Sequence, residues 1–328
     1  MGTTQPAAAA GLASLGGQTM GTSWSARVAV RASTDLHALH AIVQGALDEV
    51  VAQMSTWEAD SDISRYRRAA AGSWQALPEA FARVLEAALD VARASGGAFD
   101  PTVAPLVELW GFGAGGRPPR VPPPQLLAET RARTGWQRLQ RRAGGRELLQ
   151  PGGLHLDLSA IAKGYGADLV AAHLRAGGIT AALVEVGGEI HAFGRKPDGT
   201  PWRVLVESAA DEQADVEAMP PRVLQLDDAA VATSGDRWHR FEQDGRRYAH
   251  TIDPRTGVPV ADAAAAVTVV AADAMHADAW ATALTVMGAQ AGLEFARSHG
   301  LAACFVIREA GGLREAMTDA FNARLVQP

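Results

Sequence analysis

The chain has almost no cysteine: Cys304 is the only one among its 328 residues. A single thiol excludes an intrachain disulfide, and it also excludes a metal cluster built from several thiolates. Cys304 lies in the apolar run LAACFVI (301–307), a setting that favours a buried structural thiol over a nucleophile.

Long hydrophobic runs are also missing. No stretch approaches the roughly 20 apolar residues that cross a bilayer as a helix, so no transmembrane segment is expected. The first 17 residues, MGTTQPAAAAGLASLGG, have no basic residue and make a poor signal peptide, and Pro6 breaks a myristoylation signal. The sequence leaves two possibilities open: a cytoplasmic protein, or one whose targeting segment has been removed.

Positive charge is not in excess, because 30 Lys and Arg face 36 Asp and Glu, a net charge of −6. This balance argues against a nucleic-acid partner. The densest basic cluster, 138–146, has no aromatic residues between its arginines and is interpreted as a solvated hairpin.

Two phosphate-binding motifs are absent as well. There is no P-loop, and the glycine pair in VEVGGEI leads into a predicted strand rather than a helix, so it is no dinucleotide fingerprint.

Hydrophobic residues make up 48% of the chain, enough for a core in one large domain or two close lobes. Residues 1–16 are predicted to be a flexible lead, and 17–328 to form the folded domain. The stretch 111–124 holds nine Gly or Pro in fourteen residues and is expected to be an exposed connector or a lobe boundary. Strands in runs separated by helices favour an α+β fold with mixed sheets. Helices are expected at 34–54, 78–95, 159–175, 274–287 and 289–299, and strands at 19–30, 154–158, 181–186, 189–194, 202–207, 222–226, 229–234, 246–252, 267–271 and 301–307.

Asp278 and Thr282 are four residues apart in a predicted helix and so share one face. A carboxylate and a hydroxyl together suit Mg²⁺, which takes few protein ligands and completes its shell with water or phosphate. The alternative is an acid that interacts with the helix dipole beside a threonine that only packs.

Three further segments bring polar residues to turns or helix starts. In SAIAKGY (159–165), Ser159 can cap a helix whose free amides, with Lys163, would favour an anion; otherwise it is an ordinary capped helix. In GGAFDPT (96–102), Phe99 and Asp100 could hold a ring and its polar edge, or form only a structural turn. In HTIDPRTG (250–257), His250 precedes an Asp–Pro turn and is suited to acid–base or phosphate contact, or is structural.

In this order, these segments resemble the ApbE family of FAD:protein FMN transferases. The resemblance extends from residue 19 to about 305 and rests on eight segments in register: TMGTSWS (19–25), MSTWEADSDISRYR (54–67), GGAFDPTVAPLVELWGFG (96–113), LDLSAIAKGYGAD (156–168), LVEVGGEIHAFG (183–194), VATSGDRW (231–238), YAHTIDPRTGVPV (248–260) and MHADAWATAL (275–284).

The resemblance implies an α+β fold of two intimate lobes, with mixed sheets, flanking helices and FAD in a cleft between the lobes. It implies a Mg²⁺ site formed by Asp278, Thr282 and the carbonyl of Ala162. His250, or a metal-bound carboxylate such as Asp278, would act as the base. It also implies that a larger set of residues contacts FAD. Lys163 is included because it lies where an anion is expected to bind. The set is Met20, Trp57, Ala98, Phe99, Asp100, Ser159, Lys163, Tyr165 and Ile252.

The implied reaction transfers FMN from FAD to a Ser or Thr hydroxyl of an acceptor protein and releases AMP. The acceptor would carry a Ser/Thr-Gly-Ala-Ser/Thr-like segment, as redox-complex subunits do. If a targeting signal has been removed, the family analogy favours the periplasm or cell envelope. One departure is Arg67, where the family usually has Asn. The sequence therefore leaves open two rivals: a Mg²⁺-dependent FAD pyrophosphatase and a protein that binds FAD without cutting it.

Overall fold

The computed structural model describes residues 11–142, 144–206, 222–235, 240–260, 264–309 and 312–326. Several predicted segments extend outside these ranges: the flexible lead at 1–10, the basic cluster at residue 143, a strand at residue 207 and a segment of the family resemblance at 236–238. Across the described part of the chain, no helix is both long and apolar enough to span a membrane.

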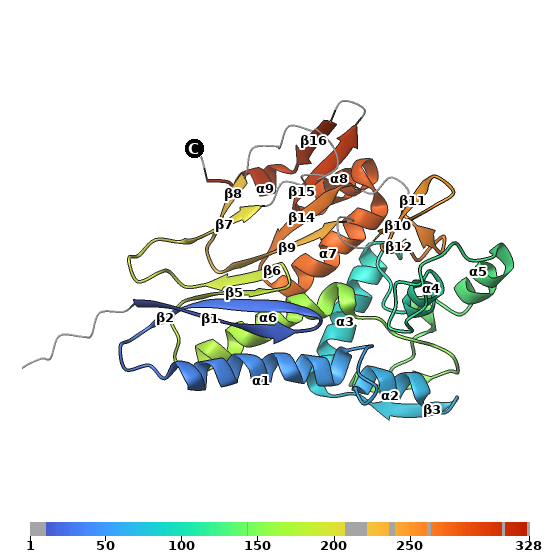
Figure 1. Ribbon diagram of the computed structural model, residues 1–328, viewed down its shortest axis with the longest axis horizontal. Coiled ribbons are helices and arrows are strands. Elements are labelled where there is room, and N and C mark those ends of the chain that lie inside the picture. Colours follow the sequence, from blue (N-terminus) through green and yellow to red (C-terminus); the bar gives the residue numbers. More distant parts are fainter. Residues whose placement is uncertain are drawn as a thin grey trace, which may run out of the picture.

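The architecture is built on one large antiparallel sheet (Figure 1). Eight strands of the described chain follow the order β1-β2-β5-β6-β9-β14-β15-β16, and each neighbouring pair is antiparallel. The α+β class predicted from the sequence is confirmed. The strands are Gly11–Thr19 (β1), Thr22–Val30 (β2), Ala182–Val186 (β5), Glu189–Phe193 (β6), Ala229–Gly235 (β9), Ala266–Ala271 (β14), Ala302–Glu309 (β15) and Gly312–Met317 (β16).

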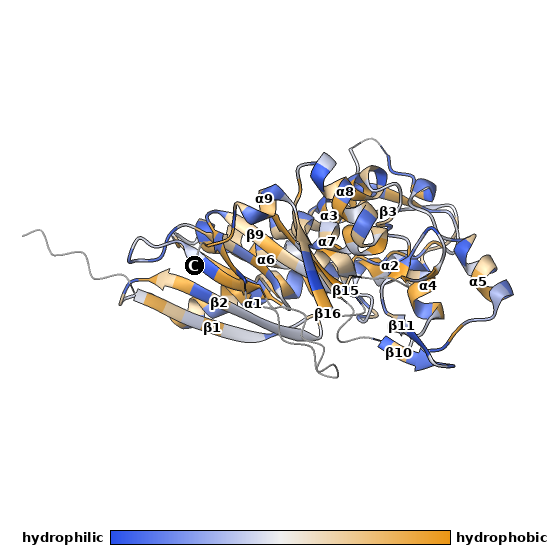
Figure 2. Cartoon of the chain, turned by 90° about the horizontal axis from the view of Figure 1, so that it is seen from above, coloured by the Kyte–Doolittle hydropathy of each residue, from blue (hydrophilic) through white to orange (hydrophobic). Residues whose placement is uncertain are grey.

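Helices pack against this sheet and bury its apolar side chains. Helix α6 contacts β5 and β6, α7 contacts β9 and β14, and α3 packs outside them against α6 and α7. Apolar residues gather in these inner elements, whereas the β10–β11 hairpin is mostly hydrophilic (Figure 2). The helices are Leu36–Met54 (α1), Glu79–Ala94 (α3), Ser159–Ala176 (α6), Ala274–Met287 (α7) and Ala289–Ser298 (α8).

A second core cluster joins the sheet to a small two-stranded unit. Trp202 and Leu224 of this unit are fully buried together with Phe321 of a short C-terminal helix and with residues of the main sheet. This small unit is formed by Trp202–Val206 (β7), Arg222–Leu226 (β8) and Asp319–Asn322 (α9).

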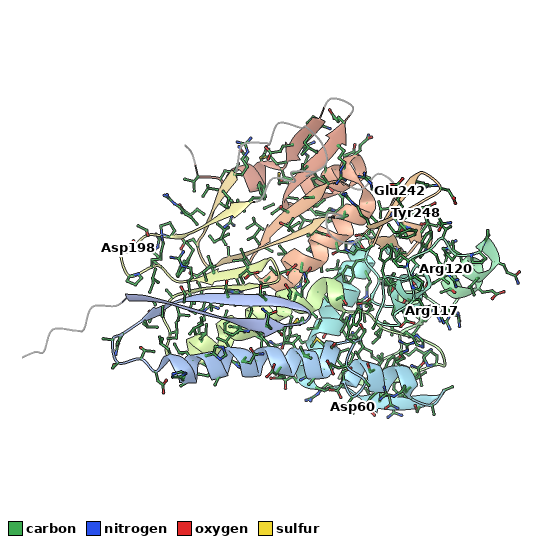
Figure 3. All side chains as sticks on the ribbon, in the orientation of Figure 1. Asp60, Arg117, Arg120, Asp198, Glu242 and Tyr248 are labelled. Carbon is green, nitrogen blue, oxygen red and sulfur yellow. The ribbon has the colours of Figure 1, made fainter. Side chains whose placement is uncertain are left out.

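The remaining elements lie toward one end of the molecule (Figure 1). There the predicted connector 111–124, whose last residue begins α5, is tied to the β10–β11 hairpin, because the amide of Val121 donates to the side-chain oxygen of Gln243, 3.0 Å away. Arg120 and Tyr248 lie at this end in Figure 3. These elements are Asp62–Arg68 (α2), Ser73–Ala76 (β3), Ala104–Leu109 (α4), Pro124–Arg131 (α5), the 3₁₀ turn Trp136–Arg138 (η1), Glu147–Gln150 (β4), Arg240–Gln243 (β10), Arg246–Ala249 (β11), Ile252–Asp253 (β12) and Val258–Pro259 (β13).

Helix ends follow the local chemistry of the sequence. Asp35 caps α1 by accepting from two first-turn amides, and Asp273 caps α7 by accepting from the amide of His276. Helix α3 follows Pro78 and ends before Gly96 and Gly97, both at positive φ, where glycine has no side chain to clash. The helices expected at 34–54, 78–95, 274–287 and 289–299 are therefore confirmed to within a few residues.

Five local predictions differ from the structure. The strand expected at 19–30 begins only at Thr22, because Thr19 ends β1 and residues 20–21 form the turn. Residues 11–16, expected in a flexible lead, belong to β1 and pair with β2. Ser159 does not cap α6; instead its own amide donates to the Asp157 carboxylate. Residues 154–158 belong to no helix or strand. The strand expected at 246–252 is interrupted at His250 and Thr251, because the chain turns there from β11 to β12.

Candidate active site

The contact between α6 and α7 brings together residues that are distant in sequence. The amide of Gly164 donates to Oδ2 of Asp278 at 3.1 Å. A Cβ on Gly164 would lie only 2.1 Å from the carbonyl oxygen of Ala274, so only glycine allows the two helices to approach this closely. Thr282 lies one turn beyond Asp278 on α7 and is half-buried.

Asp278 is an acid in a largely dehydrated position. Only 5% of the residue is exposed, and burial raises the pKa of its carboxyl group. The charge of Lys163 and the Gly164 hydrogen bond partly offset this shift, because both favour the ionised form. A buried carboxylate of this kind gains stability from a bound cation.

Lys163 forms an ion pair with Glu189 of β6, with 2.6 Å between Nζ and Oε1. Burial would lower the pKa of Lys163, but the charges of Glu189 and Asp278 outweigh it and the pKa is raised. Glu189 is 2% exposed, and its Oε2 is buried with no hydrogen-bond partner in the part of the chain that the structure describes. Burial, followed by the charge of Asp278, raises the pKa of Glu189. The charge of Lys163 therefore stabilises the ionised forms of two buried carboxylates, Glu189 and Asp278.

Several residues expected to contact FAD share one buried cluster at this junction. Phe99 and Tyr165 belong to the cluster, Met20 packs against it, and Ala162, predicted as a metal ligand, is a member as well. Met20 has a positive φ of 48° in the turn between β1 and β2, and its Cε would be 3.1 Å from a Cβ on Gly166. Burial raises the pKa of the Tyr165 hydroxyl.

Asp100 is held by its own loop and by the 3₁₀ turn η1. Its carboxylate accepts from the amide and the hydroxyl of Thr102 and from the amide of Trp136. Burial raises the pKa of Asp100, and these hydrogen bonds partly offset the rise. Ala98 beside it is 1% exposed. These hydrogen bonds explain the conformation of the GGAFDPT turn without a ligand.

Two of the expected FAD contacts are open to solvent. Trp57, in the loop between α1 and α2, is 70% exposed, which is unusual for so large an apolar side chain. Ser159 at the start of α6 is also exposed.

The HTIDPRTG segment lies against the same region through its turn. Arg255 is held by the Asp253 carboxylate, which accepts from its amide, Nε and Nη2. The Arg255 side chain also lies 3.9 Å from the Cβ position of Gly97. Ile252 is 5% exposed and packs in a cluster with Leu106 and Trp110. The ring of His250 has an edge contact with Phe112, with 6.4 Å between their centres.

Arg67 is paired with an acid from a different helix. Both of its terminal nitrogens donate to the carboxylate of Glu108 on α4. This pair borders a small pocket that also includes Thr56, Ser64 and His155. Burial, followed by the charge of Arg67, lowers the pKa of His155.

Two acids of this site, Asp168 and Glu189, were not identified from the sequence, and neither was Asp273, which only caps α7. Asp168 is the last residue of the segment 156–168, and Glu189 lies in the middle of the segment 183–194. Both segments carry the family resemblance, and that position was the only signal for either residue. No local spacing connects either residue to α7. Asp273 could have been identified as a cap, because it directly precedes the predicted helix.

Comparison with known proteins places this arrangement in a class of flavin-transferring enzymes. The ApbE family model matches residues 20–305. A curated relative from Klebsiella pneumoniae, "FAD:protein FMN transferase", is 37% identical over 327 residues, covering 98% of this chain and 92% of the relative. A relative of the same name from Vibrio cholerae is 37% identical over 94% of this chain and 91% of its own length.

Solved structures agree. The apo form of Pseudomonas stutzeri flavinyl transferase ApbE is 38% identical with a TM-score of 0.88, covering 96% of this chain and 97% of the other. The flavin transferase ApbE from Vibrio cholerae is 36% identical with a TM-score of 0.87, covering 96% and 100%. The chain belongs to the ApbE family.

Proposed function

We propose that the chain transfers the FMN part of FAD to a Ser or Thr hydroxyl of an acceptor protein in a Mg²⁺-dependent reaction and releases AMP. Both relatives are named FAD:protein FMN transferase, which supports FAD as the donor and a protein as the acceptor. The observation that carries the proposal is the buried carboxylate of Asp278, hydrogen-bonded to Gly164 at the α6–α7 contact and close enough to Lys163 for their charges to interact.

The oxygen atoms at this contact fit a Mg²⁺ ion. Asp278 offers a carboxylate and Thr282 a hydroxyl on the same face of α7, and the carbonyl of Ala162 lies two residues before the Gly164 amide. Hard oxygen donors are what Mg²⁺ prefers. When bound, the ion would offset negative charge on the FAD phosphates.

Residues around the junction would hold the donor. Lys163, near the start of α6, would balance phosphate charge, and Glu189 would keep its ammonium group in place. The apolar cluster would contact the flavin or adenine rings, with the exposed Trp57 available to stack on one of them. The full proposed set is Met20, Trp57, Ala98, Phe99, Asp100, Ser159, Lys163, Tyr165 and Ile252.

In the transfer step, the acceptor hydroxyl oxygen forms a bond to the FMN-side phosphorus. The bond from that phosphorus to the bridging oxygen breaks, and AMP leaves with the electron pair. The hydroxyl proton passes to His250 or to the Asp278 carboxylate. We infer that the acceptor presents a Ser/Thr-Gly-Ala-Ser/Thr-like segment, as a redox-complex subunit would.

The deciding experiment incubates the protein with FAD, Mg²⁺ and a peptide carrying that segment, followed by mass spectrometry. A peptide heavier by one FMN unit, with the loss of that adduct when the acceptor hydroxyl is replaced by Ala, supports transfer. Free FMN and AMP with an unmodified peptide would instead indicate hydrolysis. Intact FAD would indicate binding alone.

A further inference from the structure

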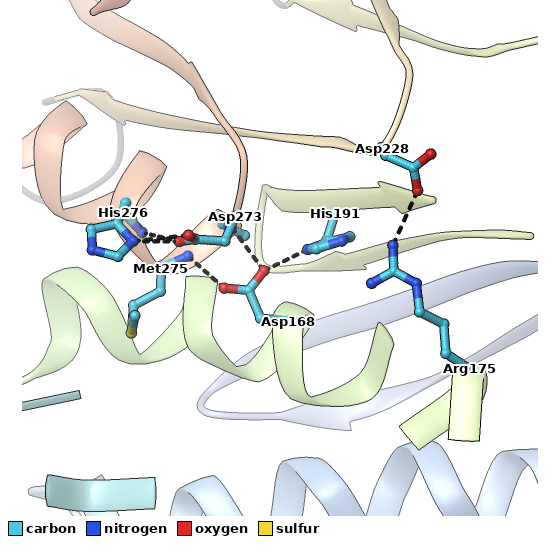
Figure 4. A network of polar contacts seen from close by, with 8 residues as sticks. Asp168, Arg175, His191, Asp228, Asp273, Met275 and His276 are labelled. Atoms are coloured by element: carbon cyan, nitrogen blue, oxygen red, sulfur yellow. Dashed lines mark hydrogen bonds and ion pairs between the residues drawn. The ribbon is translucent and has the colours of Figure 1, made fainter. Parts of the chain in front are cut away.

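A carboxylate on α6 caps the beginning of α7. Asp168 Oδ1 accepts from the amide of Ala274 at 2.8 Å, and Oδ2 accepts from the amide of Met275 at 2.9 Å (Figure 4). First-turn amides of a helix have no partner within that helix, so they must be satisfied from outside. A negative charge at this end also interacts favourably with the helix dipole.

His191 of β6 fixes the orientation of the Asp168 carboxylate. Its Nδ1 lies 2.6 Å from Oδ1, and the two side chains are only 8% and 16% exposed. Asp168 is therefore anchored to the sheet through His191, and it in turn binds the first turn of α7. Figure 4 shows the carboxylate between the His191 ring and the first turn of α7.

The contacts between the two helices form two rungs. Asp168 lies four residues after Gly164 on α6, and Asp278 lies four residues after Ala274 on α7. One rung is Gly164 with Asp278, and the other is Asp168 with Ala274. Residues four apart share a helix face, so the two rungs together fix how α6 slides and rotates against α7.

This geometry matters because the proposed metal ligands are divided between the two helices. Ala162 is on α6, whereas Asp278 and Thr282 are on α7. We propose that Asp168 is a positioning residue that keeps α7 in register with α6 and thereby sets the separation of these ligands. The inference rests on the proposed function, because it concerns the metal site of that same reaction.

The test compares Asp168→Asn with a matched variant, Asp273→Asn. Asp273 caps the same helix, but among the described residues its carboxylate accepts from His276 on α7 and from no residue of α6. Both changes remove a carboxylate from the same helix end, so a role confined to capping predicts equal effects. Each purified protein is titrated with Mn²⁺, and free Mn²⁺ is followed by electron paramagnetic resonance, with and without FAD.

We expect Asp168→Asn to raise the Mn²⁺ dissociation constant about tenfold and the Mg²⁺ concentration for half-maximal transfer by a similar factor. The maximal rate at saturating Mg²⁺ falls less, and metal-free FAD affinity stays within twofold. Asp273→Asn leaves the metal constants within twofold. Equal metal constants for the two variants would overturn the inference.

A second variant covers the case in which Asp168→Asn does not fold. Asp168→Glu keeps the charge but adds a methylene group, which displaces the oxygens from the two amides. It should shift the Mn²⁺ constant in the same direction, and an unchanged constant in this folded protein also overturns the inference. Failure of the proposed function looks different, because the unaltered protein would then show no Mn²⁺ site coupled to FAD.

Discussion

The amide of Gly164 and the carboxylate of Asp278 form a hydrogen bond between two helices whose residues are 114 positions apart. The bond orients one carboxylate oxygen away from solvent in a residue that is 5% exposed. Its partner position tolerates no side chain, since a Cβ would meet the Ala274 carbonyl. The sequence thus combines a glycine and an acid to build a charged site inside a close helix contact.

Replacing Asp278 should damage metal binding more than replacing Thr282. Asp278 contributes a charge, whereas the Thr282 hydroxyl is neutral and water can partly substitute for it. Asp278→Ala should abolish Mg²⁺-dependent transfer. Thr282→Ala should leave a remnant that higher Mg²⁺ partly restores, and FAD affinity without metal should change little in either. Rates measured across a Mg²⁺ series would check this.

The control for this prediction is Thr285→Ala on the same helix. The Thr285 hydroxyl donates to the Ala281 carbonyl and is buried, so its loss tests the general effect of removing a threonine from α7. Its Mg²⁺ dependence should match that of the unaltered protein. If Asp278→Ala kept normal activity at low Mg²⁺, the metal would have to bind elsewhere and Asp278 would have only a packing role.

Elements with a strong local signal could be predicted from the sequence, and tertiary contacts could not. Helix α1 has a regular apolar stripe and a capping Asp35, so both its presence and its ends were predictable. Strand β1 was missed because GLASLGGQT has few large apolar residues, and its pairing with β2 stabilises it. The Asp168–Ala274 contact spans 106 positions and leaves no local pattern.

FAD should bind more tightly than FMN or riboflavin, and Trp57 should contribute to the difference. An exposed indole that stacks on a ring gains contact only when the ligand is present. Stacking of a base on an aromatic side chain contributes about 1–3 kcal/mol, so Trp57→Ala should weaken FAD binding roughly tenfold at little cost in stability. Calorimetric titration with the three flavins measures this.

Leu205→Ala is the matched variant for that titration. Leu205 is 59% exposed, but it lies on β7, which forms a sheet with β8 apart from the α6–α7 contact. Its FAD affinity should equal that of the unaltered protein. Equal affinities for FAD, FMN and riboflavin would count against the proposed donor site.

The Asp273–His276 pair should make stability depend on pH in a defined window. The hydrogen bond that His276 donates to the Asp273 carboxylate raises the pKa of His276 above its ordinary 6.5. Burial would raise the pKa of Asp273, but the bonds from His276 outweigh it and the pKa falls below 3.8. The pair therefore stabilises the fold fully between pH 3.8 and 6.5. This contribution is lost as pH rises through the folded pKa of His276, or falls through that of Asp273.

Thermal melting across pH compares the unaltered protein with His276→Gln. Their difference in melting temperature should be largest inside that window and shrink on the alkaline side. The effect should be small, because His276 is 40% exposed and such pairs contribute about 0–1 kcal/mol. His37→Gln, an exposed histidine on α1, is the control. A difference that stays constant with pH would contradict the prediction.

His250 should be required for transfer but not for folding. It lies between β11 and β12, is half-buried, and touches the ring of Phe112, so an alanine there removes little core packing. Loss of a positioned acid–base group lowers rates by about 10²- to 10⁴-fold. We therefore expect His250→Ala to reduce transfer at least 10²-fold, with an unchanged melting temperature and FAD affinity within a few-fold of the original. His173→Ala, an exposed histidine on α6, should behave like the unaltered protein. Flavinylation of the acceptor peptide at saturating Mg²⁺, followed by mass spectrometry, measures the transfer. If His250→Ala kept full transfer activity, His250 would have no part in the mechanism and Asp278 would remain as the proton acceptor.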